Sequence, residues 1–297
     1  MNITPECLHC LYGQALKSAR LIGCSEAQTK EILDATAQTL IRLQPGSVPP
    51  PVAAVPIYDA IAQIVGQSDP IKPYKQMATV QAAKTLAHVR MQIAASKHPI
   101  LTALRAAIAG NVLDFGAQKH FDLAAELDRV FAAPLAVDDS GRLLESLETA
   151  KTVLVLGDNA GEHLFDNLLL ETLAAAYSAQ RRIYATRGKP AINDITLDEA
   201  KADGLDRFAE LISSGVDTPG TVLDRTDAVF RKHFETADVV IAKGMGNYEC
   251  LEGCGKAELY FLFKIKCSVV AAATHQAEGS LMILRNSASK DSSRLES

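Results

Sequence analysis

The chain has 297 residues, of which 48% are hydrophobic and 22% charged, so it can bury one large core or two unequal ones. Its formal net charge of −5 gives no electrostatic footprint for nucleic acid or for an anionic membrane surface. Residues 1–12 lack the basic flank and apolar region of a signal peptide, and no apolar run approaches the ~20 residues that span a bilayer. We therefore expect a cytoplasmic protein with a small-molecule partner and no nucleic-acid or membrane partner.

The first part of the chain has the pattern of helices. A hydroxyl cap, a proline and an acid at residues 4–6 form a helix start, and Ser25 precedes a second one. The prolines between residues 45 and 56 predict a stiff surface connection, after which residues 58–65 resume the helical period.

Three more helical segments follow before residue 145. Segment 74–95 carries one apolar stripe at helical spacing, which we expect to face the core. The stripe consists of Met77, Val80, Leu86, Val89 and Ile93. A helix at 99–109 is expected to end with Gly110 as its C-cap, another covers 122–131, and residues 137–141 are predicted to form a polar turn.

From residue 152 onwards, short apolar runs alternate with helical segments about every 30 residues, which is the length of a βα unit. The runs are residues 152–156, 182–186, 208–212, 238–242 and 268–273, and the helical segments are 163–178, 196–203 and 224–235; residues 257–264 fit a strand or a buried helix. We predict an α/β fold, a three-layer α/β/α domain with an open, mostly parallel sheet at 146–286. An all-helical domain at 1–145 precedes it, and a disordered serine-rich tail at 287–297 follows it.

Polar residues follow four of the five predicted strands. The segments are 157–162, 187–194, 213–220 and 243–249. The carboxyl ends of parallel strands open onto one edge of a sheet, so these segments are expected to form one cleft. Ser213 and Lys189 are predicted to bind substrate there, although Lys189 and its neighbour Arg187 could instead be solvated.

Asp158, Asn159 and Asp194 supply two carboxylates and an amide carbonyl at this edge. Hard oxygen donors suit Mg²⁺ or Mn²⁺. A single aspartate at a strand end is more often a helix cap or a turn residue, but three such donors together favour a metal site.

The segment from Lys243 to Asn247 resembles a phosphate cradle, because Gly244 and Gly246 let backbone N–H groups approach an anion and the lysine adds charge. Asn247 is expected to share in substrate binding. Glu162 could act as general base or orient another group, and the alternative is an acid that complements a helix dipole. A metal together with a phosphate cradle suggests phosphoryl transfer to water.

Six cysteines do not make a disulfide framework in a chain of this size. Cys7 and Cys10 form one Cys-x-x-Cys on the first helix, which supplies two ligands where a structural zinc site needs four. A redox pair or half of a metal site is possible there, and two buried apolar residues are the commoner case. His163, His233 and His275 stand alone, and no role is assigned to them.

Six blocks of the chain resemble the metal-dependent damage-control phosphatases, long known as domain of unknown function 89. They are GNVLDFG at 110–116, GDNAGE at 157–162, RGKPAINDIT at 187–196, SSGVDTPGT at 213–221, VVIAKGMGNYE at 239–249 and FKIKC at 263–267. The blocks occur in family order across nearly the whole chain.

The resemblance implies hydrolysis of small phosphorylated metabolites, such as sugar phosphates or damaged cofactor phosphates, with Mg²⁺, Mn²⁺, Co²⁺ or Ni²⁺. It implies that Asp158, Asn159 and Asp194 hold the metal and that Lys243 lies beside the phosphate. It also places the family's substrate-binding Asn and Asp of the helical region at Asn111 and Asp114. The N-terminal cysteines resemble those of one branch of the family.

Several alternatives stay open at this point. An activated water or Asp158 itself could be the nucleophile. A methyltransferase that uses S-adenosylmethionine could occupy a similar sheet, and a non-catalytic metal- or redox-sensing protein could be built on Cys7 and Cys10. The sequence makes no prediction of oligomeric state.

Overall fold

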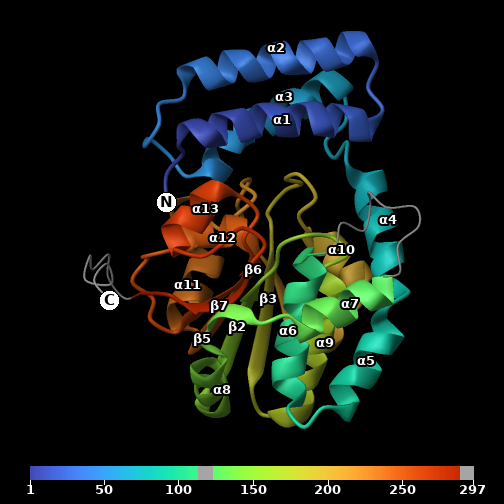
Figure 1. Ribbon diagram of the computed structural model, residues 1–297, viewed down its shortest axis with the longest axis vertical. Coiled ribbons are helices and arrows are strands. Elements are labelled where there is room, and N and C mark those ends of the chain that lie inside the picture. The colour runs from blue at the N-terminus through green and yellow to red at the C-terminus, as the bar shows by residue number, and fades with distance from the viewer. Residues whose placement is uncertain (113–122, 288–297) are drawn as a thin grey trace.

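In a computed structural model of the chain, an open sheet lies between two layers of helices (Figure 1). The structure describes residues 1–112 and 123–287. Within these residues the sheet has seven strands, in the order β1-β7-β6-β5-β2-β3-β4. They span Leu135–Asp138 (β1), Thr152–Leu156 (β2), Arg181–Thr186 (β3), Glu210–Ser213 (β4), Val239–Lys243 (β5), Leu259–Lys264 (β6) and Leu281–Arg285 (β7).

The sheet is mostly parallel, which confirms the predicted fold class. Strands β6, β5, β2, β3 and β4 run in one direction, whereas β7 is antiparallel to β6 and parallel to β1. The chain passes from β2 to β3 and β4 on one side, and then crosses back to β5 on the other side of β2. In such sheets ligands bind where the strand order reverses, outside the carboxyl ends of the strands. The ends of β2 and β5 are therefore where a site is expected.

Three helices form a separate small core at this edge of the sheet. They are α1 (Pro5–Ile22), α2 (Glu26–Arg42) and α3 (Pro50–Val65). The predicted start at Ser25 is confirmed, because its hydroxyl accepts a hydrogen bond from the Gln28 N–H in a capping box. The prediction of a connection up to residue 56 was wrong: Pro50 and Pro51 open α3, since a proline in the first turn costs no hydrogen bond.

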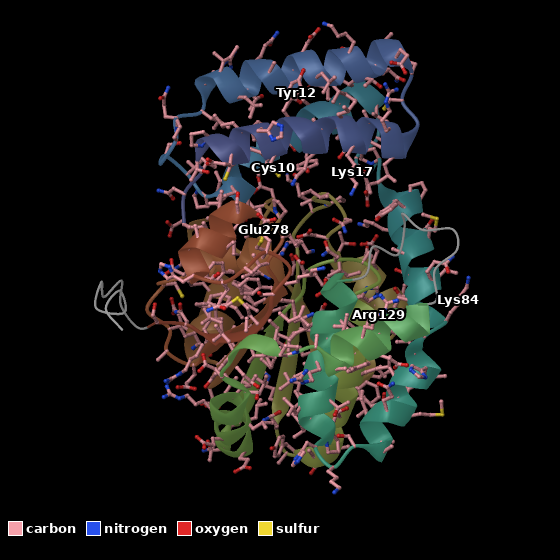
Figure 2. All side chains as sticks on the ribbon, in the orientation of Figure 1. Cys10, Tyr12, Lys17, Lys84, Arg129 and Glu278 are labelled. Carbon is pink, nitrogen blue, oxygen red and sulfur yellow. The ribbon has the colours of Figure 1, made fainter. Side chains whose placement is uncertain are left out.

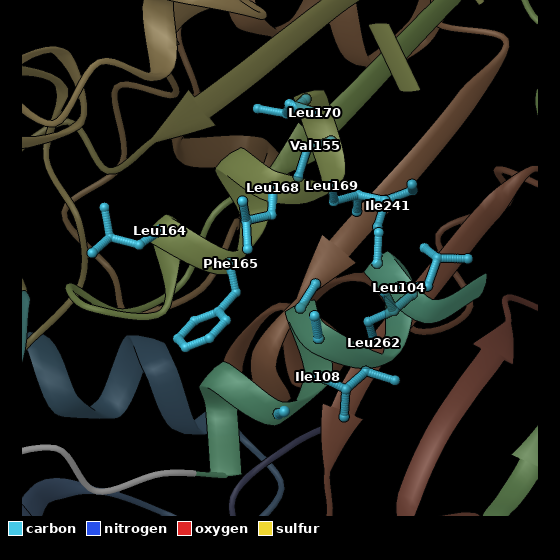
Figure 3. Close-up of a cluster of buried hydrophobic side chains, with 14 of the residues drawn as sticks. Leu104, Ile108, Val155, Leu164, Phe165, Leu168, Leu169, Leu170, Ile241 and Leu262 are labelled. Atoms are coloured by element: carbon cyan, nitrogen blue, oxygen red, sulfur yellow. The ribbon is translucent and has the colours of Figure 1, made fainter. Parts of the chain in front are cut away.

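One face of the sheet is covered mainly by α6 and α9, which pack against each other. The helices whose side chains share this core are α4 (Lys72–Ala83), α5 (Leu86–Ala95), α6 (Pro99–Val112), α7 (Leu123–Ala132), α8 (Ser140–Thr149), α9 (His163–Ala176) and α10 (Leu197–Ala202). Figure 3 shows Leu104 and Ile108 of α6 near Leu262 of β6 and Ile241 of β5, with Phe165 of α9 on the other side of α6.

The opposite face is covered by α11 (Ala228–Thr236), α12 (Gly244–Leu251) and α13 (Ser268–Thr274). Leu154 and Leu156 of β2 contact this second core, whereas Val153 and Val155 contact the first, because successive strand residues point to opposite faces. Both faces being buried explains the unbroken apolar run of β2.

Several predicted elements differ from the observed ones. Residues 268–273 form α13 and not a strand, because three consecutive alanines follow its two valines and favour helix. The strand predicted at 208–212 is β4, which starts at Glu210, and residues 257–264 contain β6. The polar turn predicted at 137–141 instead contains the end of β1 and the start of α8.

The predicted stripe on 74–95 is wrong in its first half. Met77 and Val80 are 41% and 59% exposed, because α4 ends before Leu86 and α5 begins with a new orientation. Val89 and Ile93 of α5 are buried as predicted.

Gly110 does not end its helix, because α6 continues to Val112. A Cβ at Gly110 would lie 2.9 Å from the Phe165 ring and 3.1 Å from the side chain of Glu162. The glycine is thus needed where α6 approaches α9.

The domain boundary at residue 145 stays a prediction, although side chains of α4 to α8 share the core of the sheet. Residues 288–297, in the predicted tail, lie outside the described residues. Among the helices that the structure describes, none combines the length and apolar character needed to cross a bilayer. The cytoplasmic location stays a prediction.

Candidate active site

The turn after β2 brings the three predicted metal ligands together. Gly157 follows the strand, and a Cβ there would overlap the Tyr184 hydroxyl, so the residue must be glycine. The Asp158 carbonyl then accepts a hydrogen bond from the Ile195 N–H at 2.8 Å, and the Asn159 backbone bridges that of Asp194. The loop after β2 and the loop after β3 are thus joined by backbone hydrogen bonds.

Asp158 and Asp194 form a buried acid pair. Burial, with the carboxylates of Asp194 and Glu162, raises the pKa of Asp158 well above its usual range, against the opposing charges of Arg187 and Lys266. Burial also raises the pKa of Asp194, even though its carboxylate accepts a 2.5 Å hydrogen bond from Arg187 Nε. Arg187 Nη2 lies 3.5 Å from Asp158 Oδ1. One guanidinium therefore faces two acids.

This donor set fits a divalent cation. Asn159 Nδ2 donates to Asp158 Oδ2 at 2.8 Å and to Glu162 Oε2 at 3.2 Å, which leaves the Asn159 carbonyl oxygen without a hydrogen-bond partner among the described residues. Two carboxylates and one amide oxygen, with an excess of negative charge, are what a hard cation neutralises. Mg²⁺ or Mn²⁺ could be held by Asp158, Asn159 and Asp194.

Lys243, predicted to contact the phosphate, lies beneath this site. Its Nζ donates to Glu162 Oε1 at 2.5 Å, to Asp166 Oδ1 at 2.6 Å and to the Ala107 carbonyl at 2.9 Å, and all three side chains are buried. An ammonium group has three N–H donors, so none is left for a substrate. Burial alone would lower the pKa of Lys243, but the two acids outweigh it and raise it. In this structure Lys243 supports Glu162, which in turn holds Asn159.

The predicted cradle is the first turn of α12. Gly244 has φ +77°, and a Cβ there would overlap the Asp158 carboxylate. A Cβ at Gly246 would likewise overlap the carbonyl oxygen of Pro219. Asn247 faces inward, donating to the Lys243 and Gly157 carbonyls and accepting from the Thr221 N–H. Gly246 thus lines the cleft, and Asn247 holds the turns around it.

Two residues that were predicted to bind substrate, Lys189 and Ser213, lie away from Asp158 and the first turn of α12. Lys189 is half exposed, with Nζ 3.5 Å from Asp59 Oδ1, and lines a second, smaller pocket. Ser213 ends the edge strand β4, where its hydroxyl accepts from the Gly215 N–H. Asp114 and the side chain of Asn111 lie outside what the structure describes.

A cleft of about 680 Å³ opens above the acid pair, between the sheet edge and helices α1 and α3. Asp158, Asn159 and Asp194 line its floor, and Lys266, from the segment after β6, lines its wall. Figure 2 shows Cys10 on α1 above and Glu278 below, on the two sides of this cleft. The volume suits a small metabolite.

Comparison with known proteins identifies the family of the chain. Residues 3–282 match the damage-control phosphatase ARMT1-like domain. The chain belongs to the damage-control phosphatase family.

Two curated relatives of this family are named damage-control phosphatases. One, from Pyrococcus horikoshii, is 30% identical over 96% of this chain and 99% of its own; the other, from Archaeoglobus fulgidus, is 32% identical over 91% and 94%. The crystal structure of a DUF89 family protein from Pyrococcus horikoshii superposes with a TM-score of 0.90 at 30% identity, covering 97% of this chain and 100% of that one. The fold and the phosphatase family are therefore shown.

Membership of the damage-control phosphatase family favours a phosphatase over the methyltransferase alternative. The cysteine-based alternative gains no support either. All six cysteines are free, and within the described residues no group of three or more His, Cys, Asp or Glu side chains is placed to hold a metal ion. Assignment to the cysteine-bearing branch of the family stays a prediction.

Several functional side chains escaped the sequence analysis. Buried Lys75 of α4 contacts Asp69 at 2.9 Å, Glu199 at 2.8 Å and the Asp194 carbonyl at 3.3 Å, so the helical region helps to position Asp194, a predicted metal ligand. Asp166 completes the Lys243 cluster. Lys266 stands in the FKIKC block, which was the one available signal for it.

Proposed function

We propose that this chain hydrolyses phosphomonoesters of small metabolites in the cleft above Asp158, with a divalent cation held by Asp158, Asn159 and Asp194. The observation that carries the proposal is the convergence of these three oxygen donors on the floor of a cleft whose wall carries a lysine. When bound, the cation would neutralise phosphate oxygens and so polarise the phosphorus centre.

Lys266 is the residue best placed to bind the phosphate. It lies close enough to Asp158 to lower the pKa of that acid, and within the described residues its ammonium has no ion-pair partner. Met245 and Gly246 line the same cleft at the first turn of α12, where backbone N–H groups have no intrahelical partner and favour an anion. Lysine and helix end together would hold the charge that spreads in the transition state.

Water is the nucleophile in this proposal. Both Asp158 oxygens already accept hydrogen bonds, Oδ2 from Asn159 and Oδ1 from Arg187, and the Gly244 backbone packs against the carboxylate. A carboxylate held in this way is poorly placed to attack phosphorus. The water oxygen forms the new bond to phosphorus as the ester P–O bond breaks, and the water proton passes to the leaving oxygen.

The test is a phosphomonoester panel assayed with metal-stripped protein and with added Mg²⁺, Mn²⁺, Co²⁺ or Ni²⁺. We expect turnover that depends on the ion and that is lost in Asp158→Ala. Absence of turnover with every ion, or full turnover in Asp158→Ala, would refute the proposal. The stereochemical course at phosphorus distinguishes the two nucleophiles: hydrolysis of an isotopically chiral phosphomonoester should invert the configuration if water attacks directly, whereas an Asp158 phosphoenzyme would give retention.

A further inference from the structure

A buried carboxyl group with no assigned role lines the wall of the cleft. Glu249 lies on α12 and shares its cleft-facing side with Met245 and Gly246, which precede it by four and three residues. It is only 9% exposed. Within the described residues its carboxylate has no hydrogen bond or ion pair, so a polar side chain is kept in the cleft wall without a partner in the protein.

The position of Glu249 along α12 places it beyond the reacting phosphate. Gly244, five residues earlier, packs against the Asp158 carboxylate. With a rise of about 1.5 Å per residue, Glu249 lies about 7.5 Å further along the helix axis. That distance is too great for a contact with the ester oxygen and suits a contact with the rest of the leaving group.

The surroundings of Glu249 are mostly uncharged. The thiols of Cys10, Cys250 and Cys267 lie near it, Tyr248 precedes it, and the Met1 amino group donates to its backbone carbonyl at 2.7 Å. Burial raises the pKa of Glu249 to about 7, although the Met1 amino group opposes the shift. The carboxyl is thus neutral in mild acid and ionised in mild base.

The cleft beyond the phosphate is otherwise acidic. Glu6 and Glu278 line its mouth, and the cations that line it within the described residues are Lys266 and, when protonated, His9. Once Lys266 binds the reacting phosphate, little positive charge is left for a second anion.

We propose that Glu249 selects substrates by the charge of the leaving group. An uncharged leaving group can place a hydroxyl against Glu249 whether the carboxyl is protonated or ionised. A hydroxyl can donate a hydrogen bond to the carboxylate and accept one from the protonated acid. A carboxylate or second phosphate at the same place meets a like charge with little solvent between them, which opposes its binding. The inference rests on the proposed phosphatase function and names a specificity residue of the same cleft.

The test compares two phosphomonoesters that differ in one group. Glycerol phosphate and phosphoglycerate have the same carbon number, and the second carries a carboxylate in place of a hydroxymethyl group. We expect the ratio of their kcat/KM values to favour glycerol phosphate and to rise between pH 6 and pH 8, as Glu249 ionises. The phosphate groups of the two esters titrate alike, so their titration cancels in the ratio.

Glu249→Gln keeps the shape and removes the charge. We expect it to lower the ratio about tenfold at pH 8 and to abolish its pH dependence, with the thermal midpoint kept. Glu252→Gln is the matched control, since this half-buried residue lies three positions further along and does not line the cleft. A ratio that Glu249→Gln leaves unchanged, or a wild-type preference for phosphoglycerate, would overturn the inference.

Failure of the proposed function has a different signature. If neither ester is hydrolysed with any ion, the phosphatase proposal fails, and the dissociation constants of the two esters, measured by calorimetry with the same ions, supply the ratio instead. Tighter binding of glycerol phosphate, lost in Glu249→Gln, would support the inference, and equal binding of both esters would overturn it.

Discussion

Lys243 Nζ lies 2.5 Å from Glu162 Oε1, and both side chains are at most 1% exposed. The pair lies beneath the turn that carries the proposed metal ligands, and Glu162 orients Asn159 by accepting a 3.2 Å hydrogen bond from its Nδ2. The stability of the fold and the geometry of the site therefore depend on the same lysine.

Lys243→Met should destabilise the protein by about 3–5 kcal/mol, because it leaves the carboxylates of Glu162 and Asp166 buried without their cation. Urea unfolding measures this change. Lys30→Met is the control: its ammonium lies 2.6 Å from Asp34 in a pair that is 72% and 55% exposed, and the expected loss is at most ~1 kcal/mol. Equal losses in the two variants would contradict the buried-pair explanation.

Asp158→Asn should abolish turnover while stabilising the metal-free protein above neutral pH. The folded-state pKa of Asp158 is raised, so ionising it opposes folding, and the stability of the metal-free wild type should fall as pH rises from about 4 towards that raised pKa. Melting curves across this range should show a smaller fall in the variant. A divalent ion should restore wild-type stability at high pH, and a variant that melts below the wild type at pH 8 would count against this account.

Lys266→Met should lower kcat/KM for phosphomonoesters by roughly 10- to 100-fold, mostly through KM, because it removes the cation that we propose binds the substrate phosphate. Lys266 is exposed, so the thermal midpoint should change little. Lys264→Met is a charge-matched control two residues earlier, at the end of β6 and outside the cleft. Similar kinetics in the two variants would show that net charge, and not contact, is responsible.

Gly244→Ala should lower kcat/KM by more than about 100-fold. It should also lower the free energy of unfolding by more than the roughly 1–2 kcal/mol that an alanine in the left-handed conformation usually costs. The added Cβ would overlap the Asp158 carboxylate. Gly255→Ala provides the comparison, because Gly255 has φ +85° with nothing within 4 Å of an added Cβ. It should show the conformational cost alone, with kinetics close to wild type; an equally active Gly244→Ala would mean that Asp158 can move without consequence.

The sequence predicted the fold class because both faces of β2 and β5 are buried, and such strands are unbroken apolar runs. Strand β1 was missed, since it has four residues and a half-exposed pattern, and its stability comes from pairing with β7. The error at 268–273 has a local cause, because the two valines at its start suggested a strand whereas the three alanines that follow favour the helix observed there.

For the site, the strand-end rule brought Asp158, Asn159 and Asp194 to one place, as the structure does. It could not separate Lys243 from Lys266, because Lys243 ends one buried strand, Lys266 follows another, and only the structure shows which ammonium is enclosed by acceptors. It did not find Lys75, and it placed Glu249 in the cleft segment 243–249 without a role, because the significance of both residues lies in their burial.

The pairing of β1 with β7 joins Leu135 to Leu281 across nearly the whole second half of the chain. Such long-range pairing is slow to form, since the loop between the strands must close first. One edge of the sheet therefore stays incomplete during synthesis until residues 281–285 have left the ribosome. Until then β6 exposes an unpaired edge, so a nascent chain stalled before residue 281 should be prone to aggregation.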